Sequence, residues 1–132
     1  VEEAVRIVEV VSSAGIAAVE ASGGGIGHHM TWLGPAKQKE WKQGYLRAYA
    51  SELKSRISLP VIMVGGLRDY DMSLEVIQNG DADLIAMSRP FIRDPGLVSR
   101  WQSGDLQPAE CISCNGCMER FKENQVVGCV KL

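Results

Sequence analysis

Three short apolar runs punctuate the chain, at residues 16–21, 60–64 and 84–87, and glycine, proline or polar residues bound each one. They are too short for buried helices and are rich in small and β-branched side chains, which favours buried strands. Apolar residues recur at helical spacing over residues 1–13 and 42–56. Asp69 or Asp71 can cap a third helix that runs through Ile77, and Asn79-Gly80 then ends it.

Apolar strands that alternate with helices indicate an α/β fold with a parallel sheet and right-handed crossovers. Three such strands cannot close a barrel, and alone they would leave two edges and one face bare. The chain is therefore either a complete small three-layer domain or part of a larger structure. We favour the larger structure, with the remaining strands upstream.

Residues 22–41 form a long glycine-led loop that carries His28, His29, Trp32 and Trp41. Loops of this length are uncommon unless they serve a site. One imidazole could donate a proton near neutral pH, although two adjacent histidines do not easily face one site. A solvated histidine pair is the alternative, and metal binding by the pair is less favoured because the loop has no third ligand.

Phosphate-binding features follow the second and third predicted strands. Gly65-Gly66 allows backbone N–H groups to approach an anion, and Ser88-Arg89 adds a hydroxyl and a guanidinium. In parallel α/β folds the ligand lies at these carboxyl ends of strands, and barrels often hold a phosphate between their last two strands. The alternatives are that the glycines only shape a turn and that Arg89 forms a structural salt bridge.

All four cysteines fall within the last 22 residues, as Cys111, Cys114, Cys117 and Cys129. A disulfide framework would be spread through the fold, so metal chemistry in a reducing compartment fits better. Three closely spaced thiolates and a distant fourth suit a [4Fe-4S] cluster. Zinc and free or disulfide-linked cysteines remain as alternatives, since zinc knuckles usually come as two separated pairs.

The overall composition excludes several classes of partner. A net charge of −2 and a pI near 5.7 give no basic surface for nucleic acid. No run approaches the roughly 20 apolar residues that a membrane span needs, and the first residues do not resemble a secretion signal. We expect a cytoplasmic protein; a homo-oligomer remains open.

Several motifs together resemble the old yellow enzyme superfamily, in the branch of bacterial 2,4-dienoyl-CoA reductase and trimethylamine dehydrogenase. They are Gly25-Ile26-Gly27-His28-His29, Leu59-Pro60-Val61 before Gly65-Gly66, the run over residues 80–91, Asp94-Pro95, and Cys111-Ile112-Ser113-Cys114-Asn115. The likeness implies that residues 1–105 are about strands 6–8 of an FMN-binding TIM (β/α)₈ barrel, and that residues 106–132 form a cysteine-cluster tail.

The resemblance further implies that Gly65, Gly66, Ser88 and Arg89 surround the flavin phosphate and that His29 is a catalytic proton donor. The N-terminal half of the barrel would supply the remaining flavin contacts, so we expect the fragment alone neither to hold FMN tightly nor to turn over. Two details depart from the reductase pattern: two residues, not three, separate Cys114 from Cys117, and a serine precedes Arg89.

The implied activity is transfer of reducing equivalents from NAD(P)H through FMN to an activated C=C bond of a small unsaturated substrate, with the cluster relaying single electrons. An amine dehydrogenase is the nearest alternative within the superfamily. A non-redox barrel that binds a sugar phosphate, such as an aldolase or isomerase, is the alternative outside it.

Overall fold

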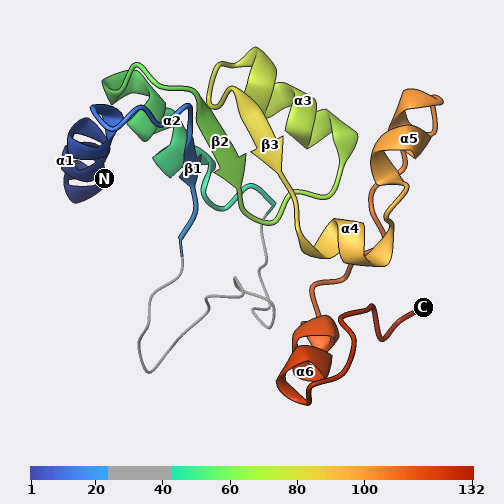
Figure 1. The fold of residues 1–132 in the computed structure, drawn as a ribbon. Coiled ribbons are helices and arrows are strands. Elements are labelled where there is room, and N and C mark those ends of the chain that lie inside the picture. The colour runs from blue at the N-terminus through green and yellow to red at the C-terminus, as the bar shows by residue number, and fades with distance from the viewer. Residues whose placement is uncertain (24–42) are drawn as a thin grey trace.

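The computed structural model describes residues 1–23 and 43–132 as alternating helices and strands followed by a helical tail (Figure 1). Its elements are α1 (Glu2–Ser12), β1 (Val19–Ala21), α2 (Arg47–Arg56), β2 (Val61–Val64), α3 (Tyr70–Gln78), β3 (Leu84–Ala86), α4 (Arg89–Arg93), α5 (Leu97–Gln102) and α6 (Gly116–Lys122). Within these two ranges, no helix has the length and apolar character that a membrane span requires.

The three strands form one parallel sheet in the order β1-β2-β3, as the apolar runs predict. The first strand is shorter than predicted and begins at Val19 rather than at residue 16. Val19 pairs with Val61, so residue 18 lies opposite Pro60, which has no N–H to donate. The ladder therefore starts where the Val19 N–H reaches the Pro60 carbonyl oxygen at 2.9 Å.

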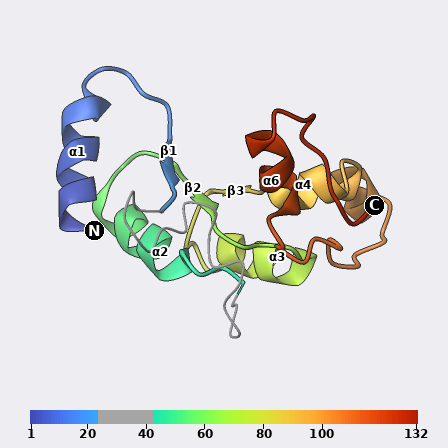
Figure 2. The same ribbon diagram turned by 90° about the horizontal axis from the view of Figure 1, so that it is seen from below.

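One face of the sheet carries the core. In Figure 2, α2 and α3 lie on the same side of the strands. Val61 and Met63 of β2 are fully buried in the cluster that also contains Leu53 of α2 and Val76 of α3. The alternate residues Ile62 and Val64 are only half-buried, and no helix of the described residues covers their face. A face left open in this way is what part of a closed barrel would present.

Helix α2 starts later than the predicted residue 42, because a turn over residues 43–46 precedes it. Gly44 adopts a φ of +64°, outside the helical region, and its carbonyl accepts the Arg47 N–H at 2.8 Å. The turn places Tyr45 and Leu46 beside the carboxyl ends of the strands.

Helix α3 has the predicted signals at both ends. Of the two predicted candidates, Asp69 is the N-cap, and its Oδ1 accepts the Met72 N–H at 2.8 Å. At the other end Asn79 is the C-cap and Gly80 has a φ of +71°. Helix α3 thus begins shortly after β2, with the Gly65-Gly66 turn between them.

The tail contains one helix that the sequence did not predict, α6, which starts between two of the cysteines (Figure 1). The tail is attached to the loop after β2 through the Ala109 N–H, which donates to the Arg68 carbonyl at 2.8 Å. It is also attached to the end of α4, where Arg93 donates to Glu110 at 2.5 Å and to the Lys131 carbonyl at 2.6 Å. The cysteine segment is thereby held next to the carboxyl ends of β2 and β3.

Candidate functional site

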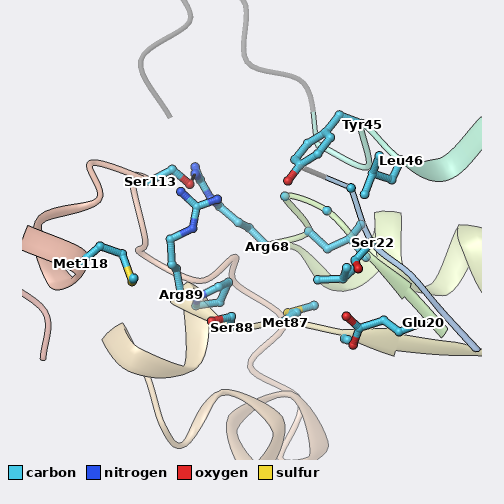
Figure 3. A pocket seen from close by; sticks show the side chains of 17 residues that line it. Glu20, Ser22, Tyr45, Leu46, Arg68, Met87, Ser88, Arg89, Ser113 and Met118 are labelled. Atoms are coloured by element: carbon cyan, nitrogen blue, oxygen red, sulfur yellow. Dashed lines mark hydrogen bonds between the residues drawn. The ribbon is translucent and has the colours of Figure 1, made fainter. Parts of the chain in front are cut away.

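A cavity of about 250 Å³ lies at the carboxyl ends of all three strands (Figure 3). Ser22 and Gly23 after β1, the 64–68 segment after β2 and the 86–90 segment after β3 line it. The turn before α2 and the tail complete its wall through Tyr45 and Met118. The cavity thus occupies the position where parallel α/β folds bind ligands.

The four residues that the sequence singles out for phosphate, Gly65, Gly66, Ser88 and Arg89, all line this one cavity. Gly65 has a φ of +137°, and a Cβ placed on it would lie 3.2 Å from Leu46 Cβ and Cγ. The turn therefore needs glycine for its geometry, as the alternative interpretation holds. Both glycines line the cavity, so the turn presents backbone rather than side chains of its own to a ligand.

The Arg89 side chain points into the site and contacts the tail rather than a carboxylate. Its Nη1 donates to Asn115 Oδ1 at 2.6 Å. Among the described residues Arg89 forms no ion pair, so none of them provides the structural salt bridge considered for it. A guanidinium has five N–H donors, so this bond leaves donors for an anion.

A second guanidinium, that of Arg68, lines the same cavity, and sequence reasoning missed it. Arg68 Nη2 and Ser113 Oγ form a short hydrogen bond, and Figure 3 shows the arginine beside Ser113 and Arg89. Burial lowers the pKa of Arg68, and the positive charge of Arg89 lowers it further. Two cations at one cavity, in a chain of net charge −2, favour an anionic ligand between them.

The other wall is formed by residues for which the sequence gives no clear signal. Leu46 packs within 3.3 Å of the position that a Cβ on Gly23 would take, and it also covers Gly65. Tyr45 and Glu20 line the cavity on the side away from the two arginines (Figure 3). The site is therefore cationic at one end and carries apolar, phenolic and carboxylate groups at the other.

The four cysteines, all free, line a second and much smaller cavity of about 20 Å³. Cys114 is exposed and Cys117 is buried. Burial raises the pKa of the Cys117 thiol. Within the described residues, no three His, Cys, Asp or Glu side chains are arranged closely enough to hold a metal ion. The donor set of four thiols around one cavity fits an iron–sulfur cluster or zinc chemically, and the geometry does not choose between them.

The predicted proton donor His29 and its neighbour His28 belong to the segment 24–42, outside the described residues. The same holds for Trp32 and Trp41.

Comparison with known proteins shows the family of the chain. The profile of the NADH:flavin oxidoreductase / NADH oxidase family matches residues 3–107. An NADH oxidase of Thermoanaerobacter brockii is 32% identical over 119 residues, which is 89% of this chain and 18% of that protein. A cinnamate reductase of Clostridium sporogenes is 27% identical over 133 residues, 98% of this chain and 19% of that protein. The chain thus spans about a fifth of the length of these relatives.

Among solved structures, a 6-hydroxypseudooxynicotine amine oxidase from Pseudomonas geniculata N1 superimposes with a TM-score of 0.63 at 30% identity. The likeness covers 67% of this chain and 14% of that one. It is consistent with the predicted α/β fold, part of a TIM barrel. The open face of the sheet, the site at the strand ends and the profile match over most of the residues lead to one conclusion: the chain belongs to the NADH:flavin oxidoreductase / NADH oxidase family, in the old yellow enzyme superfamily.

Proposed function

We propose that the cavity at the carboxyl ends of β2 and β3 holds the phosphate of FMN in an NADH-dependent flavin oxidoreductase. The observation that carries the proposal is the meeting of the open Gly65-Gly66 turn with two guanidinium groups, Arg68 and Arg89, in one cavity. Family membership supports FMN as the mononucleotide. A sugar phosphate in a non-redox barrel would use the same strand ends, but no relative described above is a non-redox enzyme.

The residues of this chain would bind and orient the cofactor. Backbone N–H groups of the Gly65-Gly66 turn and the Ser88 hydroxyl would donate to phosphate oxygens, and Arg89 would pair with the phosphate charge. Leu46 and Tyr45 form the wall away from the arginines and would exclude water from the more apolar part of the ligand. When bound, FMN supplies the exchange of reducing equivalents between NADH and the organic substrate.

For the substrate we propose a small molecule with an activated C=C bond. One relative is named a cinnamate reductase, which supports this class. The likeness to an amine oxidase supports an oxidation of amines as the second candidate. Anaerobic assays of the full-length protein with NADH and an enone or unsaturated thioester, beside assays with a secondary amine and an artificial acceptor, separate the two.

We propose His29 as the proton donor to the substrate, supported by its glycine-rich loop and its place in the motif of residues 25–29. In the full-length enzyme, His29→Ala should lower substrate turnover while the reduction of the flavin by NADH stays normal. His28→Ala is the matched control, because at most one of the adjacent imidazoles is expected to face the site. Unchanged turnover in His29→Ala would contradict the proposed role.

We also propose a [4Fe-4S] cluster on Cys111, Cys114, Cys117 and Cys129, supported by their shared cavity. Iron and sulfide analysis of anaerobically purified protein should give about four of each per chain. Zinc without iron would contradict the cluster.

We propose that the chain divides into a barrel part, residues 1–105, and a tail, residues 106–132. The match to the family profile supports this division, since it ends near that boundary, at residue 107. We also propose a location in the reducing cytoplasm.

The direct test of the main proposal is flavin content. Full-length wild-type protein should be yellow, contain FMN and lose its flavin absorbance on addition of NADH under anaerobic conditions. Arg89→Met should lose most of its FMN, since charge-assisted bonds to phosphate contribute about 1.5–3 kcal/mol. Arg56→Met, which removes a guanidinium paired with Glu2 at 2.8 Å in α1, is the matched control. A colourless wild-type protein that does not bind added FMN would contradict the proposal.

A further inference from the structure

The segment from Cys111 to Cys117 faces two sites at once. Its cysteines line the small cavity that they share with Cys129. The residues between them contact the other site: Ser113 Oγ bonds Arg68, and Asn115 Oδ1 accepts from Arg89 at 2.6 Å. Both arginines line the larger cavity, and Ser113 lines it with them (Figure 3). One short segment is therefore shared by the cysteine cavity and the candidate cofactor cavity.

The backbone of this segment has an unusual conformation at the two residues that contact the arginines. Ser113 and Asn115 both have positive φ angles, 52° and 61°, a conformation that serine in particular rarely adopts. Ser113 is also buried, with only 4% of its surface exposed. A conformation that costs free energy persists only where surrounding contacts hold it. The side-chain hydrogen bonds of Ser113 and Asn115 go to the two arginines.

These contacts fix how the guanidinium groups are presented. A guanidinium is planar, so a bond at one Nη restricts the direction of its remaining donors. Neutral acceptors leave the full positive charge in place, whereas a carboxylate would cancel it. Ser113 and Asn115 are neutral, so these two hydrogen bonds orient the guanidinium groups without cancelling their charge.

We propose that Ser113 and Asn115 are positioning residues of the cofactor site: they hold Arg68 and Arg89 in the orientation that binds the phosphate of FMN. The cysteine segment is then a structural part of the phosphate site. This inference rests on the proposed function. It predicts that the affinity for a phosphorylated flavin depends on two side chains that belong to the tail.

The test compares FMN with riboflavin, which has the same ring system but no phosphate. Deflavinated full-length protein is titrated with each flavin and binding is followed by flavin fluorescence. Asn115→Gly and Ser113→Gly should each weaken FMN binding about tenfold, the loss expected for one bond to a charged group, and leave riboflavin binding unchanged. Glycine suits both positive φ angles, so these variants should fold.

Asn124→Gly is the matched control, because Asn124 has a φ of 55° but lies in an exposed turn after α6. It should leave both affinities unchanged. Asn115→Asp retains the acceptor and the backbone preference but adds a negative charge beside Arg89, so it should weaken FMN binding at least as much as the glycine variant. Iron and thiol counts on each variant verify that the cysteine segment is intact.

The titrations distinguish failure of the positioning role from failure of the proposed function. If the wild-type protein binds FMN and the two glycine variants bind it equally well, the positioning role is wrong and the proposed function stands. Equal weakening of FMN and riboflavin would also overturn the positioning role, since it would indicate general loosening of the site. If the wild-type protein binds neither flavin, the proposed function fails and this inference fails with it.

Discussion

Gln43 holds the backbone of Arg68: its side-chain oxygen accepts the Arg68 N–H at 2.9 Å and the Asp69 N–H at 3.3 Å. Its amide nitrogen donates to Asp69 Oδ2 at 2.6 Å. One side chain before α2 thus fixes the end of the loop that starts with Gly65. The turn that carries Tyr45 and Leu46 and the glycine turn after β2 are joined by it.

Gln43→Ala should therefore loosen this loop. Loss of its acceptor leaves two backbone N–H groups without their partner, at a cost of about 1 kcal/mol or more. In the full-length protein, amide hydrogen exchange at Arg68 and Asp69 should accelerate about tenfold. Gln125→Ala is the control, since the Gln125 side chain donates to Glu123 in an exposed turn. Unchanged exchange at Arg68 in the Gln43 variant would show that the bond does not restrain the loop.

The contact between Gly65 and Leu46 gives a second prediction. Gly65→Ala should weaken FMN binding and destabilise the loop by about 1–3 kcal/mol, because of its φ of +137° and the close approach to Leu46. Combining Leu46→Ala with Gly65→Ala removes the steric clash with Leu46 but not the strain of the positive φ at residue 65. Stability of the double variant, measured by urea titration, should lie above that expected from the two single variants added together. Strict additivity would argue against the contact.

The carboxylate of Asp83 makes the stability of the fold depend on pH in the acidic range. The hydrogen bond from Lys54, and next that from the Val61 N–H, lower the pKa of Asp83 below its ordinary value of 3.8. The carboxylate therefore contributes stability above pH 3.8, and this contribution is lost as the pH falls through the lower folded-state pKa. Asp83→Asn should flatten the pH dependence of the urea midpoint below pH 4.

Lys54→Met tests the stated cause of that behaviour. Removing the ammonium leaves only the Val61 N–H to favour the charged form of Asp83. The slope of stability against pH below pH 4 should then lie between those of the wild-type protein and Asp83→Asn. A variant as steep as the wild type would assign the effect to another group.

Gly116 gives a prediction about the fourth cysteine. A Cβ on Gly116 would collide with the side chain of Val130, the neighbour of Cys129. Gly116→Ala should push the segment around Val130 away from Cys117 and lower the iron content of the purified protein. Gly96→Ala is the control for substitution of a glycine, since a Cβ there would make only an ordinary contact, with Asp94 Oδ1 at 3.7 Å. Full iron content in Gly116→Ala would contradict the shared metal site.

The sequence predicts much of this architecture because its strongest signals are local. Short apolar runs between turn residues indicate the three strands, and Asp69 and Gly80 mark the ends of α3. The start of β1 could not be predicted from local signals, because it depends on the register of β1 with Pro60, a residue about forty positions away. The start of α2 was missed because Gly44 takes a positive φ within an otherwise helical pattern.

The same distinction applies to the candidate site. Gly65, Gly66, Ser88 and Arg89 could be predicted because each lies within three residues of the end of a strand. Arg68 carries no such signal, and its inward direction depends on Ser113, which lies far along the chain in the tail. The second role of the cysteine segment was hidden for the same reason: its spacing indicates a metal site, whereas the contacts of Asn115 depend on how the tail folds back.

A crystal structure of the full-length protein with FMN would locate the phosphate directly. We expect the phosphate to lie in the cavity at the ends of β2 and β3, with oxygens within hydrogen-bond distance of the Gly66 backbone N–H and the Arg89 guanidinium. A phosphate bound elsewhere, with this cavity filled by protein side chains, would contradict this expectation.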